Sequence, residues 1–177
     1  MVRLGTRYVY QTFWGATVPT NTATSTVTLT NFGIVYQFLV AGRIVGMRYA
    51  RENRSSGFVM GQVFNGSTGA LERVTLFRQK TATAAGFDRW EHAYFHPWLR
   101  VTANASKQFA IWCASMRMKL NTGGLNAASV THGNIRALID NTAGGQPNGA
   151  TSLDGCVACS TSAGGPLYGI DVLFLPD

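Results

Sequence analysis

Residues 21–30, NTATSTVTLT, have threonine at every even-numbered position, and this strict period of two is the feature that most restricts the fold. The odd-numbered positions include Val27 and Leu29. A period of two places alternate side chains on opposite faces of a strand, and threonine favours extended backbone. The segment therefore predicts a half-buried strand with a threonine solvent face.

Further short apolar runs follow, separated by clusters of Gly, Asn, Ser or Pro that are typical of turns. They predict strands at 33–40, 43–50, 58–64, 70–78, 87–95, 98–102, 108–118 and 167–177. Gly46 predicts a bulge or a close backbone approach inside its strand, and Pro97 predicts a strand end or an edge. Together the runs predict an all-β fold, an antiparallel β-sandwich of jelly-roll-like type with about nine short strands and a long loop before the last strand.

Composition agrees with this fold class. Charged residues make up only 13% of the chain, with three Lys and three Glu in all, whereas Thr occurs 19 times and Gly 20 times. A helical bundle or coiled coil needs Glu and Lys on its solvent faces, so this composition argues against both.

The 177 residues correspond to one domain, which we expect to span residues 21–177. Residues 1–20 are expected to be an N-terminal docking segment, and residues 119–165, rich in Gly, Asn, Ala, Ser and Thr, a long irregular loop. Residues 1–20 lack the apolar run of a signal peptide, and no apolar stretch reaches membrane-spanning length. These observations predict synthesis in the cytoplasm and no membrane insertion.

The net charge of +7 raises the question of nucleic-acid binding, but the basic residues are scattered. The densest stretch, residues 48–54, is interrupted by Glu52. A groove that tracks phosphates concentrates its charge, so we expect no nucleic-acid partner and interpret the surface as matched to an acidic neighbour.

Two groups of residues resemble parts of metal sites. His92 and His96 are four residues apart, but the segment reads as a strand and lacks the zinc-protease order of residues. Cys156 and Cys159 have the spacing of half a zinc site, for which Cys113 and His132 provide no matching pair. We predict no metal and no cofactor, and whether Cys156 and Cys159 pair stays open.

Catalytic motifs give no better match. The sequence has neither a G-x-S-x-G nucleophile elbow nor a phosphate-binding P-loop, and its eight acids are spread singly. We therefore predict no catalytic residues and a protein that is not an enzyme.

Aromatic residues gather in two places. The N-terminal group, which is either packed on its own sandwich or docked on a neighbouring subunit, is our candidate anchor and consists of Tyr8, Tyr10, Phe13 and Trp14. The second group either fills the core with alternate members, which we favour, or forms a stacking platform for sugar rings. It consists of Phe87, Trp90, Tyr94, Phe95 and Trp98.

The order of strands and turn glycines over residues 31–112, with the last strand, resembles a known family. The pattern includes AGRIVGMRY at 41–49, QVF at 62–64, VTLF at 74–77, FHP at 95–97 and FAIW at 109–112, with YGIDVLF at 168–174. It is similar to a domain of unknown function found in minor tail proteins of phages that infect actinobacteria. Phe87 departs from the pattern, which often has Trp there, and so does the charged loop 51–56.

The resemblance implies a β-sandwich in a virion and no catalytic residues. Its matched positions imply a turn at Gly42, a bulge at Gly46, core side chains at Tyr49, Phe64, Phe77 and Trp112, and a hydrogen-bonded Asp171 if that residue is buried.

It further implies a structural protein of a tailed phage, most specifically a minor tail or tail-tip protein that contributes to host attachment. The alternatives are a capsid decoration protein of the phage head and a carbohydrate-binding module. We expect other virion proteins as partners, a homo-oligomer with a trimer favoured, and a host cell-surface glycan as a further candidate partner.

Overall fold

The computed structural model describes residues 9–19, 21–51, 57–80, 89–125, 129–138, 158–159 and 165–177. Throughout this part of the chain the fold is all-β, which confirms the predicted fold class. The strands are β1 (Asn21–Phe38), β2 (Gly42–Arg51), β3 (Gly57–Asn65), β4 (Leu71–Lys80), β5 (Arg89–Val101), β6 (Ser106–Leu125), β7 (Val130–His132), β8 (Ile135–Ala137), β9 (Ala158–Cys159), β10 (Gly165–Tyr168) and β11 (Ile170–Pro176).

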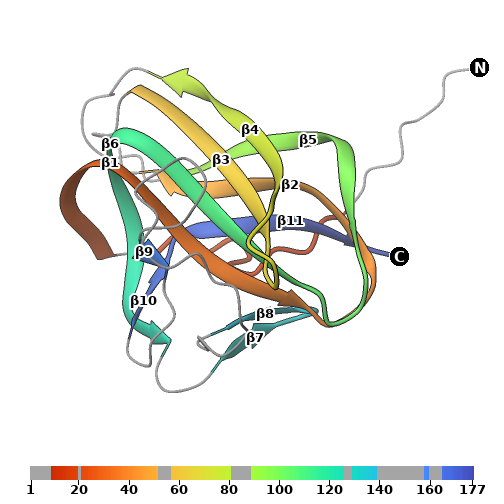
Figure 1. The fold of residues 1–177 in the computed structure, drawn as a ribbon. Coiled ribbons are helices and arrows are strands. Elements are labelled where there is room, and N and C mark those ends of the chain that lie inside the picture. The colour runs from red at the N-terminus through yellow and green to blue at the C-terminus, as the bar shows by residue number, and fades with distance from the viewer. Residues whose placement is uncertain are drawn as a thin grey trace, which may run out of the picture.

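The strands form two layers (Figure 1). In one layer β2 lies between β5 and β11, and in the other the order is β4-β3-β6-β1-β8-β7. Among the described residues, pairing is antiparallel except between β1 and β9, and one β2–β6 pair, Arg51 with Met118, joins the layers. This arrangement is a β-sandwich.

Two strands are much longer than the sequence pattern indicated. β1 has 18 residues, because the predicted strands at 21–30 and 33–40 are one continuous strand. It pairs with β6, which has 20 residues and extends past both ends of the predicted strand at 108–118. Likewise β5 continues through Pro97, which follows a cis peptide bond, and joins the predicted strands at 87–95 and 98–102. The irregular region is also narrower than expected, because β6 extends to Leu125 and β7 and β8 form a hairpin.

The core lies between the layers and is strongly aromatic. Phe38 contacts Phe174 with ring centroids 4.9 Å apart, and Tyr49 meets Phe77 edge-on at 4.7 Å. Phe64 is also buried. Trp112 corrects the expected set of core residues, since it is half-buried and its ring centroid lies 6.4 Å from that of the exposed Phe58.

Gly46 lies where β2 shifts register against both of its neighbours. A Cβ atom at this position would overlap the carbonyl oxygen of Ala93 on β5. The residue therefore has to be glycine for β5 to approach at the bulge, as the sequence suggested.

Candidate functional site

Asp171 on β11 is a buried acid with several hydrogen-bond partners. Its side chain is fully buried, and its carboxylate accepts hydrogen bonds from the backbone N–H of Phe13 at 2.8 Å and of Trp14 at 3.1 Å. Arg48 on β2 donates from Nε at 3.0 Å and from a terminal nitrogen at 2.6 Å. The backbone N–H of Val172 also donates, at 2.8 Å, so five N–H donors converge on the carboxylate. The sequence implied a hydrogen-bond partner at Asp171 if that residue is buried.

The guanidinium of Arg48 is itself enclosed. It lies over the ring of Trp90, with Cζ 4.2 Å from the ring centroid, and donates to the carbonyl oxygen of Gly15. Burial raises the pKa of the Asp171 carboxyl, while Arg48 and the N–H of Phe13 lower it. Because both charges are shielded from solvent and hydrogen-bonded, this pair fixes structure rather than offering a reactive group.

The N-terminal segment, residues 9–19, is held by this network. Gln11 exchanges two backbone hydrogen bonds with Phe174, at 2.7 and 2.9 Å, so it occupies the position next to β11. Phe13 then enters the core, with its ring centroid 5.2 Å from Tyr36 and 4.6 Å from His132, and His132 Nδ1 lies 2.6 Å from the Phe13 carbonyl oxygen.

These contacts bear on the two interpretations of the aromatic N-terminal group. Phe13 and Trp14 are buried in their own sandwich, because folding the segment against β11 removes both side chains from water. Tyr10 is half-buried, and its ring centroid lies 6.5 Å from that of Tyr94. Tyr8 lies outside the described residues. Phe13 and Trp14 therefore pack on their own domain, which is one of the two interpretations of this segment.

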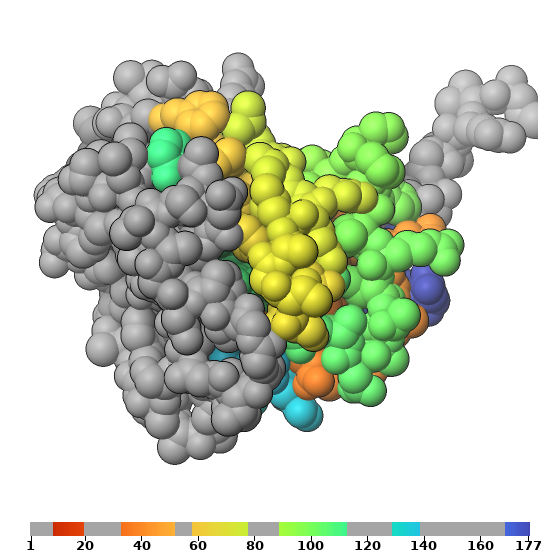
Figure 2. All heavy atoms as spheres, viewed as in Figure 1, coloured from red at the N-terminus to blue at the C-terminus, as the bar shows by residue number. Residues whose placement is uncertain are grey.

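The β4 edge of the sandwich differs from the β11 edge in its strand pairing. Among the described strands β4 pairs only with β3, so its other edge has no strand partner there. Leu76 and Val74 on β4 are 57% and 48% exposed, and Phe58 on β3 and Leu71 are exposed as well. Figure 2 shows β4 and β5 side by side on one surface of the molecule. We call Phe58, Leu71, Val74 and Leu76 the β4 apolar face.

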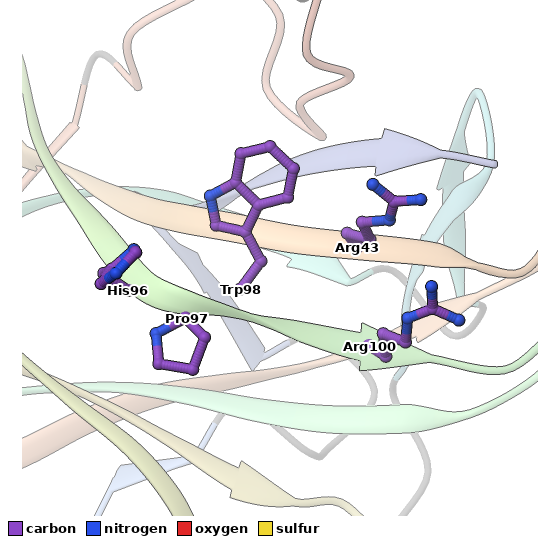
Figure 3. A pocket seen from close by; sticks show the side chains of 5 residues that line it. All are labelled: Arg43, His96, Pro97, Trp98 and Arg100. Atoms are coloured by element: carbon purple, nitrogen blue, oxygen red, sulfur yellow. The ribbon is translucent and has the colours of Figure 1, made fainter.

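Next to this surface, β2 and β5 form a basic hollow of about 440 Å³ (Figure 3). It is lined by Arg43, His96, Pro97, Trp98 and Arg100. Arg43 and Arg100 are directly opposite each other in the β2–β5 register. The Arg43 guanidinium carbon lies 5.9 Å from the centroid of the Trp98 ring.

The second aromatic group is divided between core and surface, as alternation along β5 requires. Phe95 is buried and Trp90 is partly buried, whereas Tyr94 is 61% exposed and Trp98 is 36% exposed. Phe87 lies outside the described residues. Trp98 is thus the member of the group that borders the hollow.

The residues considered for a metal site do not come together where the structure describes them. His92 and His96 lie on the outer face of β5, and no group of three or more His, Cys, Asp or Glu side chains converges within the described part of the chain. Cys156 and the side chains of Cys113 and Cys159 lie outside the described residues, which therefore leave the pairing of Cys156 and Cys159 open.

Sequence reasoning missed the basic hollow because Arg43 and Arg100 are 57 positions apart and only strand register makes them neighbours. The alternation of His96, Trp98 and Arg100 along β5 was the available signal.

In the part of the chain that the structure describes, no helix is long and apolar enough to cross a membrane. No protein-family model and no curated protein matches this chain.

Proposed function

We propose that this chain is a non-enzymatic structural protein of a tailed-phage virion, most specifically a minor tail or tail-tip protein that contributes to attachment to the host surface. It acts with other virion proteins and assembles as a homo-oligomer, with a trimer favoured. The resemblance of residues 31–112 to a domain of minor tail proteins is the sequence argument for this placement.

The β4 apolar face is the observation that carries the assembly part of the proposal. An edge strand with exposed apolar side chains is a ready site for pairing with another chain, and free-standing proteins usually protect such edges. Leu76, at 57% exposure, and Val74 point away from the core on this strand. A virion subunit buries such a surface against its neighbours.

The buried carboxylates support a structural role. Asp171 is engaged by Arg48, and Glu91 lies 2.8 Å from Arg89 Nε and 3.8 Å from a terminal nitrogen of Arg51. Both acids are therefore committed to ion pairs with arginine, whereas a general acid or base needs access to a substrate proton. The exposed arginines of the basic hollow instead suit recognition of an acidic partner.

The test is to locate the chain in purified particles. Antibodies against the recombinant protein are applied to virions of a tailed phage whose genome encodes this chain, and labelled particles are imaged by electron microscopy. Label at the tail or tail tip is the expected result. Label over the capsid would establish the decoration alternative, and particles without the protein would overturn the virion proposal in both forms.

The oligomeric state is tested separately by sedimentation equilibrium of the recombinant chain. A trimer is expected. A monomer at micromolar concentration that binds isolated cell-wall glycan would favour the carbohydrate-binding module instead.

A further inference from the structure

The lining of the basic hollow comes from one face of one sheet. Trp98 and Arg100 are two residues apart on β5 and project to the same side, as Figure 3 shows, and His96 before them also lines the hollow. Arg43 on β2 stands directly opposite Arg100. Two cationic side chains and an indole therefore surround one cavity.

Like charges directly opposite each other on adjacent strands destabilise a sheet. Here the opposing charges have little compensation. Asp177 lies 3.5 Å from Arg43 Nε, and both side chains of this pair are well exposed to solvent. Arg43 Nε itself is buried and has no hydrogen-bond partner among the described residues, and no described carboxylate forms an ion pair with Arg100. An anion between the two guanidinium groups would compensate these like charges.

Trp98 adds a second kind of recognition. Its ring is 36% exposed and borders the Arg43 guanidinium, with Cζ 5.9 Å from the ring centroid. An aromatic face combined with polar groups suits a ligand that has an apolar side and a polar edge. The C–H face of a sugar ring has this character, and a charged substituent on that ring would then lie within reach of Arg43.

We propose that the basic hollow binds an anionic saccharide, with the sugar ring on Trp98 and its carboxylate or phosphate between Arg43 and Arg100. The volume of about 440 Å³ lies at the small end of ligand pockets and suits one or two sugar units. The inference rests on the host-attachment part of the proposed function, for which it supplies a ligand class and a site.

The test uses ligands that separate the two parts of the recognition. Glucose 6-phosphate and glucuronic acid carry both a ring and an anion, whereas glucose lacks the anion and inorganic phosphate lacks the ring. Binding is followed by isothermal titration calorimetry at low salt. We expect both anionic sugars to bind about tenfold or more tightly than either glucose or phosphate.

Variants assign the binding to the hollow. Arg100→Gln and Trp98→Ala should each weaken glucose 6-phosphate binding about tenfold or more. Trp98→Phe, which keeps a smaller aromatic face, should retain part of the affinity. The matched control is Arg136→Gln on β8, which removes the same charge outside the hollow and should leave the affinity unchanged. Thermal melting verifies that each variant is folded.

Three outcomes would overturn the inference. Phosphate binding as tightly as glucose 6-phosphate would show a simple anion site, and glucose binding equally well would show that the arginines play no part. An equal loss in Arg136→Gln would show unspecific attraction to a basic protein. If the sugar-binding inference fails, the particle-labelling result still stands as the test of the virion proposal. If the particles are unlabelled but the chain binds the anionic sugars, the virion proposal is wrong and the binding site is supported.

Discussion

The sheet edges at β11 and β4 differ in whether another described segment of the chain pairs with them. At β11 the N-terminal segment continues the sheet through the Gln11–Phe174 pair, and a buried ion pair at Asp171 holds it there. At β4 the described residues provide no further strand, and Leu76 and Val74 stand exposed.

This difference separates stability from association. The β11 edge is covered within the chain, so its aromatic and charged residues contribute to the free energy of folding. On β4, which pairs only with β3 among the described strands, the exposed apolar side chains contribute less to folding and would gain from burial on assembly. Substitutions on the two sides should therefore have different readouts.

The largest effect is expected from Asp171→Ala. It leaves the Arg48 guanidinium buried without its carboxylate and removes the acceptor of the Phe13 and Trp14 N–H groups. Breaking a buried pair from one side costs about 3–5 kcal/mol, which urea denaturation measures. The matched control Asp177→Ala removes an exposed partner of Arg43 and should cost about 1 kcal/mol or less. Equal losses in the two variants would contradict the contrast.

Phe13→Ala should destabilise the isolated chain by about 3 kcal/mol, because a fully buried ring against Tyr36 and His132 is replaced by a cavity. Chemical denaturation of the chain at a concentration where it is monomeric measures this loss. If the variant keeps its stability and loses only self-association, the segment serves as an anchor for other subunits after all.

On the β4 side, Leu76→Glu should change folding stability by no more than about 0.5 kcal/mol, because the side chain is 57% exposed. It should weaken self-association, because a charge is then desolvated in the contact. Sedimentation velocity over a concentration series measures the effect. Ser67→Glu in the exposed β3–β4 turn adds the same charge and should leave association unchanged.

The smallest effect concerns pH. Partial burial and the neighbouring Arg48 lower the pKa of His92 below its ordinary value, so the unfolded chain binds a proton on this residue more readily than the folded chain. Stability should therefore fall as the pH decreases from about 6.5 towards the folded pKa, and His92→Gln should flatten this slope. Denaturation at a series of pH values tests the prediction, and an unchanged slope in the variant would contradict it.

Part of the site was accessible from the sequence. Alternation within the predicted strand 87–95 places Tyr94 and Phe95 on opposite faces, and Asp171 needs a hydrogen-bond partner if it is buried. The identity of that partner was not accessible, because Arg48 lies 123 positions away. The surface that covers Phe13 and Trp14 was not accessible either, since a local aromatic run does not specify which surface it packs against.

The sequence by itself determined the class of the fold. The period of two at 21–30, the shortage of Lys and Glu and the turn residues between apolar runs together specify strands, since these properties act over a few neighbouring residues. The tertiary structure decided which strands merge, which edge is covered, and that Arg43 meets Arg100 beside Trp98. These features depend on register between distant strands, which is set by the packing of the whole core rather than by any local pattern.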